Sequence, residues 1–328
     1  MARIIFFARD TLNNIDKMEY YAQEVRALRE LGHEVMICNR YSSIPFKFDV
    51  IYIYWWTYAL PLLLFAKVFR RKSFVAGVFN FKFKDWAEGL DYFKRPLWQR
   101  LIMALSLKLA GKNLFASYSD YVGCTKYFSL KNSFYLPCSV GEEYFANVSH
   151  KRKENILTLS WISKGNLERK GVLDIIRAIK LMKDQGQKHQ LLIAGFPGDG
   201  EKFLSDFITG HGLTDQVKYL GEISKEKKIE LMKTCKIYAQ PSYFEGFGLA
   251  SAEALVSGMV VIATKVGDVY NTLGDYAEYI KPGDVEALAC KINDCLLAEP
   301  NKLDLKAQNY IENNFSHQQK MAWLADLI

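Results

Sequence analysis

The stretch Pro241-Ser-Tyr-Phe-Glu245-Gly-Phe-Gly248-Leu-Ala-Ser-Ala-Glu253-Ala-Leu-Val-Ser-Gly258-Met-Val-Val-Ile-Ala263 carries the strongest structural signal in the chain. It follows an apolar run at 236–240, passes through a glycine-containing loop, and continues as a helix-forming segment at 249–258. It ends in a β-branched run at 260–264. A strand, a helix and a second strand in this order predict one unit of a parallel sheet.

The loop in this stretch has the chemistry of a ligand site. Its two glycines let the backbone approach a ligand closely, and the amides of residues 248–250 begin a helix, where an anion is favoured. Glu245 lies in the loop, and the Glu253 side chain tilts toward the amino end of the helix. The segment suits a ligand with a diphosphate between hydroxylated rings. The alternative is a helix start with solvated acids.

The same alternation of strands and helices extends in both directions and predicts a parallel sheet, covered on both faces, in each half of the chain. The expected strands are 3–8, 34–39, 50–56, 74–79, 121–124, 155–160, 190–194, 217–220, 236–240 and 260–264. The expected helices are 16–31, 96–109, 171–182, 201–210, 225–234, 249–258, 285–297 and 307–327, the last interrupted at Phe315-Ser316.

The uncharged run 50–66 is the one stretch that approaches the length of a membrane span. Its first part is β-branched and aromatic, and Pro61 lies inside it. It is interpreted as a buried strand followed by an apolar helix. The first residues contain only a short apolar run between charges and do not resemble a signal peptide.

Composition restricts the class of protein. The chain has 328 residues, 50% hydrophobic and 24% charged, with a net charge of +7. Fibrous and disordered classes are excluded. The six cysteines have no CxxC spacing, which excludes metal fingers and redox motifs. Asp-x-Asp does not occur, so we expect no bound metal and no cofactor.

At this point the sequence resembles the retaining nucleotide-sugar glycosyltransferases of family four, which have the GT-B architecture. Their motif is two glutamates separated by seven residues, as at Glu245 and Glu253. The flanking residues agree, as do Lys170-Gly171 and the strand endings at Gly195 and Gly221. The resemblance covers nearly all of residues 150–328 and continues only as a weaker pattern over residues 1–150.

The resemblance implies a role for each matching residue. Glu253 would bind the ribose hydroxyls, and Glu245 would contact the donor sugar near the reacting carbon. Lys170, with Arg169, would neutralise the leaving phosphate, as a fixed cation stabilises developing negative charge. The remaining expected donor-binding residues are Gly246, Phe247, Gly248, Leu249 and Ala250 around the diphosphate and sugar, and Gly221 and Glu222 beside the base.

The resemblance also implies the architecture: GT-B, with two doubly wound Rossmann-like α/β domains facing a cleft. Residues 1–148 would bind the acceptor and residues 149–310 the nucleotide-sugar. The polar stretch 149–154 is the expected linker. Residues 311–328 would form a helix that crosses back onto the first domain.

The chain departs from the family pattern at three places. Trp161 stands where an arginine is usual, and Lys164 is the candidate substitute. Asn13-Asn14-Ile15-Asp16 replaces a glycine-rich loop, and Phe79-Asn80 stands where a histidine is common.

The basic excess belongs to the first half. Residues 1–150 contain 20 Lys+Arg and 13 Asp+Glu, whereas residues 151–328 contain 23 of each. Between Lys67 and Lys112, 11 bases are interleaved with aromatic residues, and an apolar helix ends in a basic cluster. This pattern is typical of a membrane-surface element. Residues 60–112 are therefore expected to contact a membrane. A buried helix with a solvated basic end and a nucleic-acid surface are the alternatives, and no motif supports nucleic acid.

The expected function is a retaining, metal-independent transfer of a sugar from a nucleoside-diphosphate sugar, with a UDP-sugar as the expected donor. The acceptor would be a glycan or a lipid-linked molecule in surface polysaccharide or glycolipid assembly. The expected location is cytoplasmic, peripheral on the inner face of the membrane. The alternatives are a non-catalytic sugar-nucleotide-binding subunit and another GT-B chemistry, such as that of a phosphorylase or epimerase.

Overall fold

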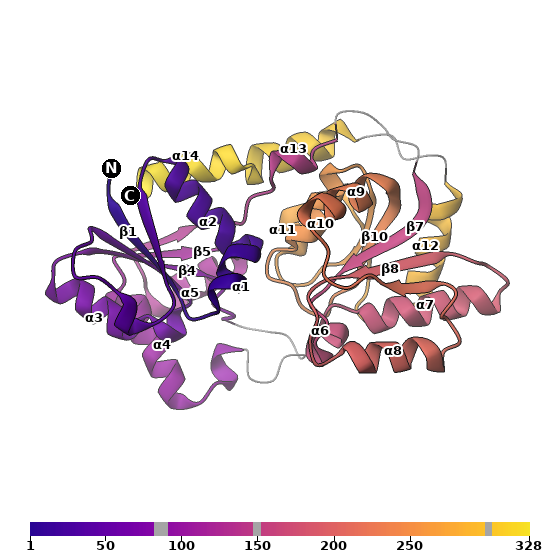
Figure 1. Ribbon diagram of the computed structural model, residues 1–328, viewed down its shortest axis with the longest axis horizontal. Helices are drawn as coiled ribbons and strands as arrows, with labels where there is room; N and C mark the ends of the chain where they lie inside the picture. The colour runs from indigo at the N-terminus through magenta and orange to yellow at the C-terminus, as the bar shows by residue number, and fades with distance from the viewer. Residues whose placement is uncertain (82–90, 147–151, 299–303) are drawn as a thin grey trace. The chain divides into compact units, whose positions relative to one another are not determined.

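The computed structural model describes residues 1–81, 91–146, 152–298 and 304–328 (Figure 1). The chain divides into two compact units, Met1–Ser139 with Phe315–Ile328, and Val140–Asn314. Each unit contains a six-stranded parallel sheet, so the predicted pair of doubly wound α/β domains is confirmed. In the predicted linker, residues 149–151 lie outside the described residues, and Lys153 begins a strand.

The first sheet has the order β2-β1-β3-β4-β5-β6. Successive strands are added on one side of β1 up to β2 and on its other side from β3 onward, so the strand order reverses between β1 and β3. These two strands run parallel and pair from Ile4 with Val50 to Ala8 with Tyr54. The strands are β1 (Arg3–Ala8), β2 (Glu34–Cys38), β3 (Val50–Tyr54), β4 (Lys72–Gly77), β5 (Lys112–Phe115) and β6 (Ser133–Tyr135).

Alternation along these strands supplies two cores. In β1, Ile4 and Phe6 belong to one buried cluster, and Ile5 and Phe7 to the other. The first cluster is covered by α1 (Leu12–Lys17), α2 (Glu19–Glu30) and α14 (His317–Leu327). The second is covered by α3 (Leu60–Val68), α4 (Leu97–Leu109) and α5 (Tyr118–Phe128).

The second sheet has the order β12-β11-β10-β7-β8-β9, the strand order of dinucleotide-binding folds. The strand order reverses between β7 and β10, which are parallel neighbours in the sheet. The strands are β7 (Lys153–Leu159), β8 (Gln190–Ala194), β9 (Val217–Tyr219), β10 (Cys235–Gln240), β11 (Val260–Thr264) and β12 (Glu278–Ile280).

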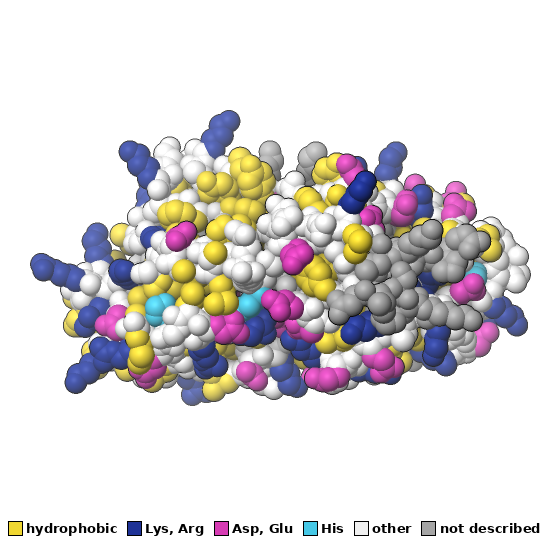
Figure 2. Space-filling view, turned by 90° about the horizontal axis from the view of Figure 1, so that it is seen from above, with side chains coloured by type: hydrophobic (Ala, Val, Ile, Leu, Met, Phe, Trp, Pro, Cys, Tyr) yellow, Lys and Arg dark blue, Asp and Glu magenta, His cyan; other side chains and the backbone are white. Residues whose placement is uncertain are grey.

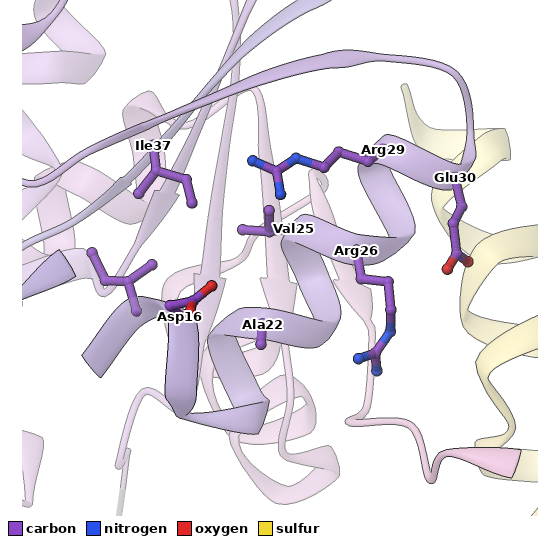
Figure 3. Close-up of a pocket in the computed structure, with 8 residues that line it drawn as sticks. Asp16, Ala22, Val25, Arg26, Arg29, Glu30 and Ile37 are labelled. Carbon is purple, nitrogen blue, oxygen red and sulfur yellow. The ribbon is translucent and has the colours of Figure 1, made fainter. Parts of the chain in front are cut away.

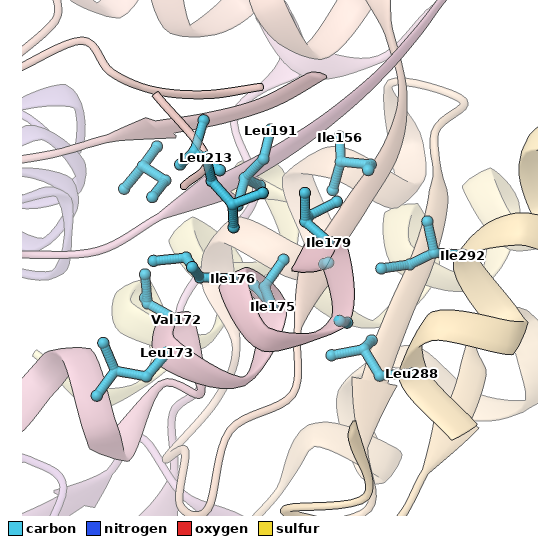
Figure 4. Close-up of a cluster of buried hydrophobic side chains, with 14 of the residues drawn as sticks. Ile156, Val172, Leu173, Ile175, Ile176, Ile179, Leu191, Leu213, Leu288 and Ile292 are labelled. Carbon is cyan, nitrogen blue, oxygen red and sulfur yellow. The ribbon is translucent and has the colours of Figure 1, made fainter. Parts of the chain in front are cut away.

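A large apolar core covers one face of this second sheet (Figure 4). Ile175, Ile176 and Ile179 of α7 pack against strand residues such as Ile156 and Leu191. This face is covered by α7 (Val172–Asp184), α8 (Glu201–Gly210) and α12 (Val285–Leu297). The remaining helices of the unit are α6 (Lys164–Arg169), α9 (Lys225–Thr234), α10 (Leu249–Val256), α11 (Val269–Leu273) and α13 (Leu305–Phe315), whose last residue belongs to the first unit.

One predicted element was wrong. The segment 121–124, expected as a strand, lies inside helix α5. The Ser117 side chain accepts a hydrogen bond from the Asp120 amide and caps this helix, a local signal that outweighs the aromatic and β-branched residues. The interpretation of the uncharged run 50–66 is confirmed, because it forms β3 and most of α3. Among the described residues, no helix has the length and apolarity to cross a bilayer.

Charge is unevenly distributed over the surface. In the face shown in Figure 2, Lys and Arg side chains predominate over acids at the end formed by the first unit, and acids are more frequent over the second. This agrees with the uneven count of bases along the sequence.

Candidate active site

The candidate site lies beyond the carboxyl ends of β7 and β10. Ligands of open α/β sheets bind at the point where the strand order reverses, outside these ends. β10 ends at Gln240, and the loop 241–248 leads from it into α10. After β7, the short helix α6 ends at Arg169 and is followed by Lys170. The fold therefore brings the two predicted motifs to one edge of the sheet.

Glu245 is the centre of this site. Its carboxylate lies 3.3 Å from the Lys170 ammonium and 3.9 Å from the Arg169 guanidinium. The Gln240 side-chain amide donates to the same oxygen at 2.7 Å. The side chains of Glu245 and Lys170 are 15% and 18% exposed. The pair is thus largely shielded from solvent while one side stays accessible.

Burial and charge act in opposite directions on this pair. Burial opposes ionisation of Glu245, but the charges of Lys170 and Arg169, and hydrogen bonds from Lys170 and the Gly246 amide, hold its pKa below the usual range. Burial lowers the pKa of Lys170, and Glu245 compensates for only part of that effect. Arg169 and Lys228 lower it further. The site is therefore an ionised carboxylate against a lysine that releases its proton more easily than usual.

Arg169 holds the loop in place. Its guanidinium donates to the Asn166 side chain at 2.9 and 3.1 Å and to the carbonyl of Phe244 at 2.8 Å. The amide of Tyr243 donates back to the carbonyl of Arg169 at 2.8 Å. Arg169 therefore fixes the chain directly before Glu245.

Two glycines shape the backbone around Glu245. Gly248 precedes α10 in the left-handed conformation, with φ +82°, and no side chain caps the helix start. The amides predicted to meet an anion, at Leu249 and Ala250, thus begin the helix. Gly267 has φ +54°, and a Cβ atom there would lie 1.7 Å from the Glu245 carbonyl oxygen. Only glycine permits this contact.

Glu253 is 1% exposed and pairs with Lys228 of α9 at 2.6 Å. The Lys228 ammonium also lies 4.9 Å from the centre of the Tyr144 ring. The hydroxyl of Ser257 bridges the carbonyls of Tyr144 and Glu253. Lys228 was missed by the sequence reasoning, because its partner lies on another helix and no local spacing connects them.

The residues expected beside the base lie further along the sheet. Gly221 and Glu222 follow β9, which is two strands from β7. The Gly221 carbonyl accepts from the Gly195 amide at 3.0 Å, which joins the loops after β8 and β9. Burial, the nearby Glu201 and Glu222 raise the pKa of Tyr219 to about 12.

Trp161, at the position of the usual arginine, is 47% exposed. Its ring N–H donates to the Pro197 carbonyl at 3.1 Å. Lys164, the candidate substitute, begins α6, and its amide donates to Asp199 at 3.1 Å. No contact of the Lys164 ammonium with Glu245 is found among the described residues.

In the first unit, a hydrogen-bonded network occupies the equivalent place after β1 and β3. The Trp55 ring N–H donates to the Tyr21 hydroxyl at 2.9 Å, and that hydroxyl lies 3.4 Å from the Asp10 carboxylate. Trp55 has φ +79°, a strained value for a bulky residue. Such strain is frequent at ligand sites.

Helix α1 takes the place of the glycine-rich loop. Its cap, Thr11, accepts from the Asn14 amide at 3.1 Å. The Asn14 side chain donates to Asp10 at 2.7 Å. At the third departure, where a histidine is common in the family, the amides of Phe79, Asn80 and Phe81 all donate to the buried Asp120 carboxylate, at 2.6–2.9 Å. Sequence reasoning did not identify Asp120.

A pocket of about 330 Å³ lies in the first unit between α1, α2 and β2 (Figure 3). Arg26, Arg29 and Glu30 line it from α2, Asp16 from α1 and Ile37 from β2. It contains none of the predicted site residues. Over the described part of the chain, no three His, Cys, Asp or Glu side chains are grouped as a metal site.

The fold is shared with solved glycosyltransferase structures of the GT-B type. Sucrose-phosphate synthase from Thermosynechococcus elongatus superposes with a TM-score of 0.80 over all of this chain and 98% of that one, at 17% identity. HepE from Anabaena, solved with UDP and glucose, gives a TM-score of 0.76 over all of this chain and 99% of that one, at 16% identity.

The family follows from the sequence match. Residues 142–315, more than half of the chain, match the model of glycosyl transferases group 1. The chain belongs to this family, so the predicted glycosyltransferase class is confirmed. The matched segment includes Lys170, Lys228, Glu245 and Glu253.

Relatives of described function share about a quarter of their residues with this chain over the aligned part. The O-antigen chain mannosyltransferase B of Escherichia coli is 26% identical over 39% of this chain and 34% of its own length. The O-antigen chain mannosyltransferase RfbU of Salmonella typhimurium is 25% identical over 72% of this chain and 65% of its own. The chain thus spans between a third and two thirds of the length of these relatives.

Proposed function

We propose that this protein is a retaining, metal-independent glycosyltransferase that moves a sugar from a nucleoside-diphosphate sugar to a glycan or lipid-linked acceptor in surface polysaccharide assembly. The observation that carries the proposal is the Glu245 carboxylate held by Lys170 and Gln240 beyond β7 and β10. The two O-antigen mannosyltransferases among the relatives support the class of product. The HepE complex with UDP supports a UDP-sugar as donor.

In this reaction Glu245 stabilises developing positive charge, and Lys170 stabilises developing negative charge. The bond between the sugar carbon and the phosphate oxygen breaks, and a bond from that carbon to the acceptor oxygen forms. Positive charge develops on the carbon, and the leaving diphosphate becomes negative and takes up the proton of the acceptor hydroxyl. An ionised Glu245 stabilises the carbon, and the Lys170 ammonium stabilises the diphosphate. The amides at the start of α10 add dipoles of the sign that a diphosphate needs.

Glu253 and Lys228 would separate when the donor binds. The buried Glu253 carboxylate accepts from the ribose hydroxyls, and Lys228 then becomes available to the diphosphate. After burial and Arg169, the positive charge of Lys228 also contributes to the lowered pKa of Lys170. Lys228 would thus become the third cation of the site, besides Arg169 and Lys170, and it would contact the diphosphate only when the nucleotide is correctly placed.

The acceptor is proposed to bind the first unit, beside Trp55 and Asp10. An aromatic ring and a carboxylate at the end of parallel strands suit a sugar, which offers an apolar face and hydroxyls. A lipid-linked acceptor would require contact with the inner face of the membrane, which we assign to residues 60–112.

Calorimetric binding of UDP, GDP, ADP and CMP, without metal, tests the donor site. We expect one nucleoside diphosphate to bind, and Glu253→Ala to weaken it. Glu222→Ala serves as the control for the base, because it should change the preference between nucleotides while leaving the diphosphate contacts in place.

Failure of all four nucleotides to bind would overturn the donor site. Binding without turnover, across many acceptors, would instead indicate a non-catalytic subunit. Dependence on inorganic phosphate, or turnover with no acceptor, would indicate a different GT-B chemistry.

A further inference from the structure

We infer that the exposed faces of α3 and α4 form a docking surface for an anionic lipid bilayer. The inference deepens the proposed function, since it names the partner that would present a lipid-linked acceptor. It rests on side-chain exposure and charge in the first unit alone.

Both helices expose apolar stripes. Pro61, Leu64 and Val68 recur at helical spacing on α3, and Leu97, Leu101 and Leu105 do so on α4. The two helices pack side by side. The large apolar side chains exposed here are Phe46 76%, Leu64 49%, Val68 75%, Phe69 46%, Leu97 67%, Trp98 60%, Leu101 55% and Leu105 48%.

This clustering is unusual for a soluble surface. Single exposed apolar residues are ordinary, but contiguous ones indicate an interaction site. Phe46 lies against Phe65 and Phe69, with ring centres 6.2 and 6.5 Å apart. These aromatic contacts extend the α3 stripe toward the loop before β3.

The charge of the described segments that carry the stripes is predominantly positive. Segments 60–81 and 91–112 contain nine bases and a single acid, Asp91, which is 4% exposed. Within these two described segments, the surface therefore presents apolar and positive groups and no exposed carboxylate. Apolar stripes with a basic rim fit a bilayer with anionic headgroups. The bases are Lys67, Arg70, Arg71, Lys72, Lys94, Arg95, Arg100, Lys108 and Lys112. Two of them, Lys72 and Lys112, donate to the carbonyls of Ile328 and Leu327 at the end of α14, so the other seven form the basic rim.

The end of α3 supplies a further argument. Arg70 adopts the left-handed conformation, with φ +52°, directly after the helix. The amide of Arg71 bonds to the carbonyl of Ala66 at 2.7 Å and closes the helix end. Glycine is the usual residue in this position. A strained arginine there keeps a positive charge where fold stability alone favours glycine.

Vesicle flotation tests the surface directly. We expect the protein to bind vesicles of phosphatidylcholine with about one third phosphatidylglycerol, and to bind phosphatidylcholine alone at least about tenfold more weakly. The variant Val68→Glu with Leu101→Glu should lose at least about tenfold in affinity. The matched control Leu297→Glu replaces an apolar residue that is 77% exposed in the second unit, and it should bind normally.

Arg70→Gly separates docking from folding. It should leave the melting temperature unchanged or higher, yet weaken vesicle binding about fivefold. Triple substitution to serine at Lys67, Arg70 and Lys108 should weaken binding further. The same change at the exposed Lys188, Lys202 and Lys218 of the second unit should have little effect.

The inference would be overturned if the unaltered protein did not bind vesicles. Equal losses of binding in the first-unit variants and in their second-unit controls would also overturn it. So would self-association that Leu101→Glu abolishes, in the absence of any vesicle binding. Nucleotide binding, measured in the same samples, is independent of lipid. A failure of docking is therefore distinguishable from a failure of the donor site.

Discussion

A lysine–glutamate pair of the first unit and one of the second have the same chemistry and different degrees of burial. In the first unit, Lys320 of α14 and Glu24 of α2 lie 2.5 Å apart and are 1% and 5% exposed. In the second, Lys170 and Glu245 lie 3.3 Å apart and are 18% and 15% exposed. Lys320 and Glu24 are almost inaccessible to solvent, whereas Lys170 and Glu245 remain partly accessible to a ligand.

The partners of each pair explain the difference. Lys320 also donates to the carbonyl of Pro137 at 3.0 Å, and Glu24 accepts from the Tyr52 hydroxyl at 2.9 Å. These groups join α14, α2 and β3 within one core. Burial lowers the pKa of Lys170, and the neighbouring cations Arg169 and Lys228 add to this effect. A satisfied buried pair fixes a structure, whereas a crowded one is suited to meet an incoming anion.

The largest expected effect is on catalysis. Lys170→Met should reduce turnover about a thousandfold, or ~4 kcal/mol in activation free energy, because the leaving diphosphate loses its cation. The free energy of unfolding should change by less than about 1 kcal/mol, because Glu245 keeps Gln240 and Arg169. Release of nucleoside diphosphate measures the rate. A variant with normal turnover would refute the assignment of Lys170.

The opposite pattern is expected in the first unit. Lys320→Met should reduce the free energy of unfolding by about 3–5 kcal/mol, because it leaves the Glu24 charge buried and unpaired. Nucleotide affinity should stay unchanged. Denaturant unfolding followed by circular dichroism measures the loss. The double variant Lys320→Met, Glu24→Gln should recover much of the stability. If it does not, the cost lies in packing rather than charge.

A smaller effect is expected at Lys228. Lys228→Met should weaken nucleoside diphosphate binding about tenfold, or ~1.4 kcal/mol, and leave binding of the nucleoside alone within about twofold. Calorimetry with both ligands provides the comparison. Lys225→Met is the matched control, since Lys225 lies on the same helix and pairs with Glu143. Equal losses with nucleoside and diphosphate would assign Lys228 a purely structural role.

The smallest effect concerns pH. The Lys170 pKa lies below its ordinary value of 10.5, so diphosphate affinity should be full below that lowered pKa and decline as the pH rises through it. Titration from about pH 7 to about pH 10 measures the decline. Lys170→Arg should move it to higher pH. If the decline persists unchanged in that variant, another group is responsible.

The sequence predicted the long, strongly patterned elements well, because apolar periodicity and the glycine-bounded helices are local signals. The interruption at Phe315-Ser316 matches the boundary of α13 and α14, where Ser316 caps α14. The short strands β5, β6 and β12 were not predicted. With three or four residues each, they depend on pairing with neighbours rather than on their own pattern.

The site could be predicted only in part for the same reason. Glu245, Glu253 and the glycines between them lie in one contiguous stretch and carry a recognisable spacing. Lys228 and Asp120 contact residues of other elements that lie far away in the sequence, and no periodic pattern predicts such contacts. Arg169 was placed at the site, but its role in holding Phe244 depends on a backbone carbonyl, which has no sequence signature.

The contact between Gly267 and the Glu245 carbonyl has a consequence for engineering donor preference. Any library that randomises the loop after β11 will lose most of its members at residue 267, since a side chain there displaces Glu245 from its partners. Diversity introduced at Glu222, directly after β9, leaves that geometry untouched, whereas Gly221 has φ +73° and disfavours any side chain. Selection for an altered nucleotide base in the donor should therefore start from the β9 side of the sheet.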